Sequence, residues 1–201
     1  SYFPVNTIIP STEIVHDRVM LELFRGCIRG CRFCQAGYAY RPVRNRSPKL
    51  LAEYGKAACE DSGYQEMTLS SLSSTDYPCL MELCDDLLDY CAPRDIGLSL
   101  PSLRADTFSM NLMERLQRVR KGGLTFAPEA GTQRLRDAIN KNVREEDLLE
   151  SCRVAFAGGW NNVKLYFMLG LPTETDEDIL GIAQIANDVL HCWRENASNK
   201  N

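Results

Sequence analysis

The chain alternates short apolar runs with longer segments whose apolar residues recur at helical spacing, from Val19 onward. We predict strands at residues 19–24, 66–70, 96–100, 124–127 and 163–169. We predict helices after Ser47, from about Pro78, from about Ser109, over 132–140 and 144–157, and after Thr175. Strands that alternate with helices are typical of parallel βα units, so the pattern indicates an α/β fold.

Capping residues support the predicted helix ends. Ser47 as N-cap and Pro48 in the first turn begin the first helix, and Gly63 ends it. Thr175 precedes the acidic residues 176–178, which suit the positive end of a helix dipole. The second and third helices carry apolar stripes of Leu80, Leu83, Leu87 and Leu88, and of Leu112, Met113, Leu116 and Val119.

Five βα units connected in the right-handed sense form part of a β/α barrel, whose sites lie at the C-terminal ends of the strands. We therefore expect a partial barrel of five to six parallel strands, with no sixth strand evident in the sequence. Residues 17–191 form the predicted core. Residues 1–16, with Pro4 and Pro10 and no initiating Met, are predicted to be a linker from an upstream domain, and residues 192–201 a polar tail.

Composition narrows the class of protein. A chain of 201 residues suits one domain, and its net charge of -4 argues against a general polyanion binder but not against a local basic patch. No apolar run is long enough to span a bilayer, and no signal peptide begins the chain, so we predict a cytoplasmic protein with no membrane contact.

Nine cysteines, an odd number, fit a reducing compartment. Cys59, Cys84 and Cys152 fall in predicted helices and should be buried as small apolar residues.

Three cysteines, Cys27, Cys31 and Cys34, stand directly after the first predicted strand in FRGCIRGCRFCQAG. Such tight spacing is typical of a metal or cluster site. A structural zinc site needs four ligands, and the chain has no second cysteine pair at the expected distance and only two histidines. An iron-sulfur cluster suits the spacing better, and three ligands leave one iron of a [4Fe-4S] cube open. A zinc-binding interaction domain is the less favoured alternative.

The CxxxCxxC spacing with Phe33 before the last cysteine resembles the radical S-adenosylmethionine (radical SAM) superfamily. The resemblance implies that the three cysteines are catalytic and bind a [4Fe-4S] cluster, with SAM as the second cofactor and an external electron donor as a partner. It also implies that Phe33 lies against the adenine of SAM. Arg25, Arg29 and Arg32 stand between or beside the cysteines, where cations favour reduction of a negatively charged cluster. The alternative is that these arginines only lie in a solvated loop.

The segments after the second and third predicted strands carry polar residues that could also reach SAM. LSSLSSTDYP stands where the superfamily has a Gly-Gly-Glu-like stretch that binds the amino group of SAM. Ser71 and Ser73 offer hydroxyls there, and Asp76 is the carboxylate available to replace the glutamate. After the third strand, LSLPSLRAD places Arg104 and Asp106 at the same rim, where a guanidinium suits a carboxylate or phosphate.

The last two strands end in motifs that resemble the methylthiotransferase and Elongator-protein-3 branch. In LTFAPEAGTQRLRDAINK, Glu129 matches a glutamate that faces SAM, and Lys141 falls where related enzymes have an arginine for the SAM carboxylate. In VKLYFMLGLPTETDED, Gly170 begins a turn that would pass the adenine edge, and Tyr166 or Met168 would face into the barrel. These two matches are specific mainly because they fall in register with the cluster loop.

The run from His16 to Leu190 resembles an uncharacterised radical SAM family in which this core follows a cobalamin-binding-like domain. EIVHDR, CRFCQAG, RPVR and FAPEAGTQRLRD carry that match. A cobalamin-binding-like domain upstream is therefore an expected partner. The basic stretch YAYRPVRNRSPK suits RNA or a phosphate-bearing small molecule, or else its cations pair with acidic helices; it contains Tyr38, Tyr40, Arg41, Arg44, Arg46 and Lys49.

The leading functional hypothesis is reductive cleavage of SAM to a 5′-deoxyadenosyl radical that acts on an unidentified substrate. By analogy with relatives, the expected substrate class is RNA, and the expected reaction is methylthiolation or cobalamin-assisted alkylation. The alternative is a non-catalytic iron-sulfur module that senses redox state or scaffolds a partner, and the serine-rich replacement of the amino-group motif favours it.

Overall fold

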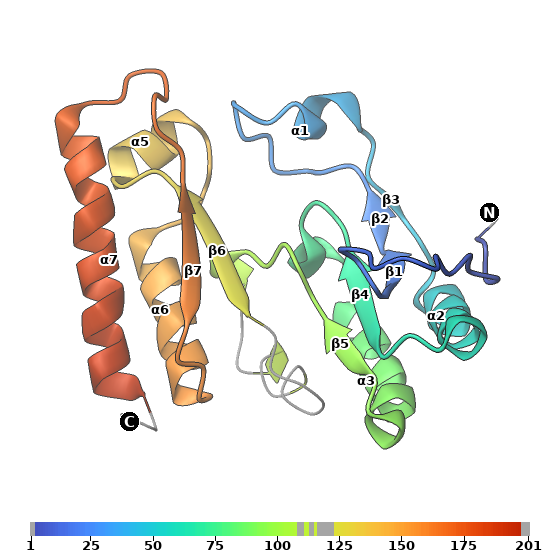
Figure 1. The fold of residues 1–201 in the computed structure, drawn as a ribbon. Helices are drawn as coiled ribbons and strands as arrows, with labels where there is room; N and C mark the ends of the chain where they lie inside the picture. The colour runs from blue at the N-terminus through green and yellow to red at the C-terminus, as the bar shows by residue number, and fades with distance from the viewer. Residues whose placement is uncertain (1–2, 108–110, 113–114, 116–122, 198–201) are drawn as a thin grey trace.

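The computed structural model describes residues 3–107, 111–112, 115 and 123–197, and Figure 1 shows their fold. Met113, Leu116 and Val119 of the predicted third helix lie outside the described residues. Leu112 of that stripe is described and buried in the core.

All five predicted strands are present, and they are parallel within two sheets. The first sheet has the order β1-β4-β5, and the second pairs β6 with β7. Their bounds are β1 Val19–Glu22, β4 Glu66–Ser70, β5 Gly97–Ser99, β6 Leu124–Glu129 and β7 Val163–Phe167. The α/β class with parallel strands is therefore confirmed. Within the described residues β5 and β6 do not pair, so the number of strands in the barrel stays a prediction.

Helices lie on the outside of both sheets (Figure 1). The first sheet carries α2 and α3, which pack on each other, while α6 and α7 pack on each other beside the second sheet (Figure 1). The helices are α1 Ala36–Ala39, α2 Pro48–Ser62, α3 Leu80–Cys91, α5 Gln133–Ala138, α6 Glu145–Ala157 and α7 Asp176–Asn196, with single 3-10 turns η1 Ser74–Asp76, η2 Ala92–Arg94 and η3 Ala105–Thr107. Ser47, Thr132 and Thr175 occupy the N-cap positions of α2, α5 and α7, although Ser47 makes no side-chain capping bond.

The core lies between sheets and helices. The predicted stripe of α3, Leu80 with Leu83, Leu87 and Leu88, is buried. Cys59, Cys84 and Cys152 are also buried, as expected. Burial raises the pKa of the Cys84 thiol to about 12 and that of Cys152 to about 12, so both remain protonated and apolar at neutral pH.

Local pairing and packing changed two predicted boundaries. The predicted strand 19–24 stops at Glu22, because Phe24–Arg25 (β2) turns away and pairs antiparallel with Arg44–Asn45 (β3). At the other end, α7 continues to Asn196, into the predicted polar tail, because Cys192 and Trp193 pack against the core. The division of the chain into linker, core and tail stays a prediction. Among the described residues, no helix is both long and apolar enough to cross a bilayer.

Candidate active site

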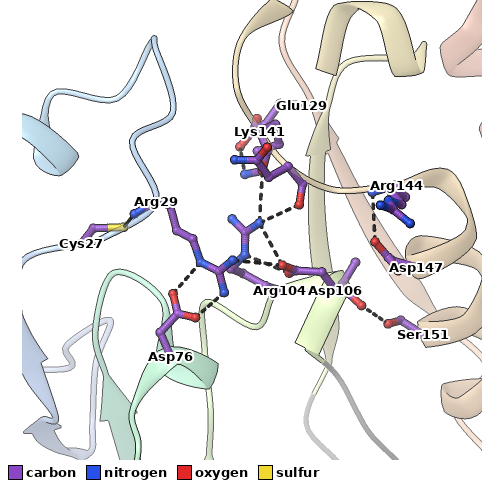
Figure 2. A network of polar contacts seen from close by, with 12 residues as sticks. Cys27, Arg29, Asp76, Arg104, Asp106, Glu129, Lys141, Arg144, Asp147 and Ser151 are labelled. Atoms are coloured by element: carbon purple, nitrogen blue, oxygen red, sulfur yellow. Dashed lines mark hydrogen bonds and ion pairs between the residues drawn. The ribbon is translucent and has the colours of Figure 1, made fainter. Parts of the chain in front are cut away.

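Loops that follow four of the parallel strands meet at one place. The cysteine loop follows β1 and β2, Asp76 lies in η1 after β4, Asp106 lies in η3 after β5, and Glu129 ends β6. Figure 2 shows Arg29, Asp76, Arg104 and Asp106 pointing toward one another, with Cys27 beside Arg29 and with Glu129 beside Lys141. The C-terminal ends of the strands therefore carry the site, as expected for a β/α architecture.

The cysteine loop is held in place by backbone contacts on both sides. Gly26 has φ +95, and a Cβ there would lie 2.3 Å from the carbonyl oxygen of Tyr40, so only glycine fits. On the other side, the backbone N–H of Arg32 donates to the carbonyl of Ile139 at 2.9 Å. Asn140 Nδ2 donates to the carbonyl of Gly30, also at 2.9 Å. Residues 138–140 thus support the loop, a role that no motif in the sequence indicated.

The three thiols lie within electrostatic range of one another. Cys31 is 8% exposed, and Cys27 and Cys34 are half-buried. Burial is the main cause of the raised pKa of Cys31, the charges of Cys27 and Cys34 add to it, and Lys141 and Arg104 act in the opposite direction. The backbone N–H of Arg29 lies 3.5 Å from Cys27 Sγ and donates to it. Such N–H to sulfur contacts stabilise the added negative charge of a reduced cluster.

The donor set fits an iron-sulfur cluster better than a single ion. Around one zinc ion, every thiolate must lie about 2.3 Å from the same point. Among the residues that the structure describes, no three His, Cys, Asp or Glu side chains are gathered in that way. A [4Fe-4S] cube is ligated at three different irons, so its cysteines stand farther apart while still sharing one loop. Ligating thiolates must be deprotonated, and the charges of Lys141 and Arg104 near Cys31 would offset the negative charge of such a set.

Glu129, Lys141 and Phe33 come together beside Cys31. Lys141 Nζ donates to Glu129 Oε1 at 3.0 Å, and both side chains are largely buried. Lys141 Nζ also lies 5.9 Å from the centre of the Phe33 ring. Glu129 sits at an irregularity in the pairing of β6 with β7 and has φ +70, a left-handed conformation that costs a residue with a Cβ about 1–2 kcal/mol. Strain of this kind is concentrated at functional sites, which favours a functional role for Glu129.

Two arginines and two aspartates connect the loops. The Arg29 guanidinium donates to both carboxylate oxygens of Asp76 and, at 3.2 Å, to Asp106 Oδ2. Arg104 Nε donates to Asp106 Oδ1 at 2.9 Å. We refer to Arg29, Asp76, Arg104 and Asp106 as the arginine–aspartate network. Arg104 and Asp106 were predicted at this rim, whereas the hydrogen bond of Arg29 with Asp106 was not.

The serines after β4 mostly bond within their own loop. Ser71 Oγ lies 2.9 Å from Ser74 Oγ, and Ser74 Oγ also donates to the carbonyl of Pro101 at 2.8 Å. Ser73 is buried. Burial is the largest single influence on the pKa of Asp76 and would raise it, but the hydrogen bonds with Arg29 and Ser73 and the charges of Arg29 and Arg104 together outweigh burial, so the pKa is lowered. Contacts of Ser71 and Ser73 with SAM stay predictions.

Tyr166 and Met168, both predicted on the last strand, lie in different surroundings. Tyr166 is 53% exposed and lines a pocket of about 320 Å³ between β5 and β6, together with Ser99 and Thr125. Met168 instead packs against a small apolar cluster around Leu135, and its N–H donates to the Glu129 carbonyl at 2.8 Å.

Gly170 lies in the turn between β7 and α7. Its φ is +78, and its N–H donates to Glu174 Oε2 at 2.7 Å. The roles of Tyr166, Met168 and Gly170 in binding SAM stay predictions.

In the basic stretch beside the cysteine loop, one arginine forms a structural ion pair, and two others are free to meet RNA or a phosphate-bearing molecule. Arg46 pairs with Glu22 at 3.0 Å, as expected for a structural cation. Tyr38 and Tyr40 are 61% and 56% exposed, on α1 and directly after it. Arg41 and Arg44 are exposed and make no ion pair with any residue in the described part of the chain.

Comparison with known proteins identifies the family. The model of the radical SAM superfamily matches residues 21–186, most of the chain. The chain therefore belongs to the radical SAM superfamily, and it is a radical SAM enzyme core whose cofactors are a [4Fe-4S] cluster and SAM.

Two relatives from one archaeon match most of this chain. An uncharacterized protein of Methanocaldococcus jannaschii is 40% identical over 170 residues, which are 85% of this chain and 37% of that protein. A second protein of this archaeon, named "Putative methylthiotransferase", is 24% identical over 86% of this chain and 39% of its own length. The chain thus spans little more than a third of either relative.

Solved structures share the fold. TsrM, a radical SAM methyltransferase from Kitasatospora setae, matches with a TM-score of 0.71 and 13% identity over 86% of this chain and 34% of that one. OxsB, a cobalamin-dependent SAM radical enzyme, matches with a TM-score of 0.64 and 15% identity over 84% of this chain and 26% of that one. At 13% and 15% identity, the two matches show a shared fold.

Proposed function

We propose that Cys27, Cys31 and Cys34 hold the cluster of this enzyme and that Glu129 and Lys141 bind the methionine part of SAM beside it. The observation that carries this proposal is the meeting of Cys31, Phe33 and the Glu129–Lys141 pair at the C-terminal ends of the strands. A cluster held there would supply one electron to SAM, so that a carbon–sulfur bond would break to give methionine and the 5′-deoxyadenosyl radical. The electron comes from an external donor.

The charges of the pair match those of the ligand. The methionine part of SAM carries an ammonium and a carboxylate, and the pair offers one group of opposite charge for each. Binding would exchange one ion pair within the protein for two with the ligand. Phe33, 38% exposed next to Lys141, provides a flat apolar surface on the same side of the loop.

We expect Glu129→Gln to weaken SAM binding about 30-fold or more. Removing one partner of a largely buried charge pair costs about 2 kcal/mol or more. Equilibrium binding of SAM to the anaerobically reconstituted protein measures the effect, with iron and sulfide determined on the same samples. Glu150→Gln is the matched control, because Glu150 pairs with Arg153 on the exposed face of α6. Equal SAM affinity in both variants would remove Glu129 from the binding site.

We further propose that the substrate is RNA and that it approaches over Tyr38, Tyr40, Arg41 and Arg44. Exposed rings suit base stacking, and the two arginines are available for phosphates. The second Methanocaldococcus relative is named "Putative methylthiotransferase", and this name supports a group-transfer reaction.

A salt titration of RNA binding tests this surface. We expect the double variant Arg41→Ala/Arg44→Ala to bind weakly and to reduce the slope of log affinity against log salt by about two, one for each lost phosphate contact. Arg153→Ala on α6 should leave both quantities unchanged. An unchanged slope in the double variant would mean that RNA, if bound, does not contact this surface.

A further inference from the structure

Arg29 stands between two of the proposed cluster ligands, and its side chain leaves the cysteine loop. Its Nε donates to Asp76 Oδ2 at 2.8 Å, a second nitrogen donates to Asp76 Oδ1, and a third reaches Asp106 Oδ2 at 3.2 Å (Figure 2). A planar guanidinium that makes a two-pronged contact has a fixed orientation, unlike a lysine at the same place. The side chain is mostly buried, so its position is set by these contacts.

Arg104 extends the connection to the loop after α5. It donates to both oxygens of Asp106, at 2.9 and 3.3 Å, and to the carbonyl of Lys141 at 3.1 Å. The arginine–aspartate network thus joins four segments: the cysteine loop, η1 after β4, η3 after β5 and the loop that carries Lys141. Shifting any one of these loops would break at least one charge-assisted hydrogen bond.

The network is electrically balanced, with two cations and two carboxylates. Both oxygens of Asp76 are engaged by Arg29, and its side chain is 11% exposed. Asp76 is also the carboxylate that the sequence offered for the amino group of SAM. Each carboxylate oxygen can accept a second hydrogen bond, but with only 11% of its side chain exposed Asp76 offers little open surface to a ligand while the contact with Arg29 is maintained.

We propose that Arg29 and Asp76 are positioning residues that fix the cysteine loop and set the reduction potential of the cluster, and that Asp76 is not a ligand of SAM. This inference rests on the proposed function, in which Cys27, Cys31 and Cys34 hold the cluster. Net charge near a cluster and hydrogen bonds to its sulfurs are among the factors that set its potential. Arg29 contributes both, through its side chain and through the N–H that it donates to Cys27 Sγ.

Redox titration of the reconstituted protein without SAM tests the proposal. We expect Arg29→Gln to lower the midpoint potential, because a cation is lost, and Asp76→Asn to raise it, because an anion is lost. The double variant restores the charge balance and should return toward the parent value. Asp86→Asn is the control, since it also removes one carboxylate charge, from an exposed ion pair with Lys56 that joins α2 and α3 on the outside of the first sheet. We expect no shift for this control.

The outcomes separate this inference from the proposed function. If the parent protein binds no [4Fe-4S] cluster, the proposed function itself fails. If the parent holds the cluster but Asp76→Asn leaves the SAM-free potential unchanged and weakens SAM binding instead, Asp76 is a SAM ligand and only the present inference is wrong. If Asp76→Asn cannot retain a cluster, the potential of Asp106→Asn tests the inference instead. Asp106 lies outside the cysteine loop and pairs with both Arg29 and Arg104, so we expect its replacement to raise the potential.

Discussion

Replacing Cys31 with alanine is expected to abolish cluster binding, with iron and sulfide falling to background in anaerobically reconstituted protein. Cys31 is the most buried of the three cysteines in the loop and the one on which the charges of Lys141 and Arg104 act. Two remaining thiolates would leave two irons of a cube without a protein ligand. Visible absorption and chemical analysis of iron and sulfide measure the loss.

The matched control for that experiment is Cys84→Ala. Cys84 lies within α3, fully buried among leucines, so its loss should cost about 1 kcal/mol of stability and no iron. Equal loss of the cluster in both variants would contradict the assignment of the ligands to the loop.

Gly131→Ala is expected to lower the free energy of unfolding by about 3 kcal/mol, at the upper end of what overpacking costs. Gly131 precedes α5 at the point where α7 approaches most closely. A Cβ there would lie 2.2 Å from the carbonyl oxygen of Asp178 and 2.4 Å from the amide nitrogen of Ile182. Both are backbone atoms of α7, so the helix would have to move as a whole. Denaturant unfolding measures the effect.

Gly123→Ala provides the comparison, because, apart from its chain neighbours, no atom of the residues that the structure describes lies within 4 Å of the Cβ that it would add. Its stability should remain close to that of the parent. If the two alanine variants were equally stable, α7 would not pack against the start of α5 as closely as the structure has it. The same packing accounts for the Ala-Gly-Thr motif at residues 130–132. Its glycine is required by the close approach of α7, and Thr132 caps α5 by accepting from the N–H of Leu135.

Periodicity predicted the elements because burial follows local spacing. The leucine stripe of α3 and the five parallel strands needed no knowledge of distant residues. The hairpin of β2 and β3 could not be predicted in this way, since strands of two residues carry no period. Among the described residues the strands form two sheets because β5 and β6 do not pair. The periodicity of either strand does not specify whether they pair.

The candidate site was predictable where a motif marks it. Cys31, Phe33, Glu129 and Lys141 were expected from spacing and resemblance, and the structure brings them together. The arginine–aspartate network was not expected. Arg29 and Asp106 stand 77 positions apart, and an arginine in a polar loop is equally consistent with simple solvation. Long-range ion pairs of this kind depend on the fold and have no signal in the sequence of a single chain.

The most direct test of the central claim is the formation of 5′-deoxyadenosine. The parent protein, Cys31→Ala and Cys84→Ala would be reconstituted without oxygen and incubated with SAM and dithionite, and the products separated by chromatography. We predict 5′-deoxyadenosine from the parent and from Cys84→Ala, and none from Cys31→Ala. Absence of the product from a parent protein that holds a full [4Fe-4S] cluster would contradict SAM cleavage at this site and would favour a redox-sensing or scaffolding module instead.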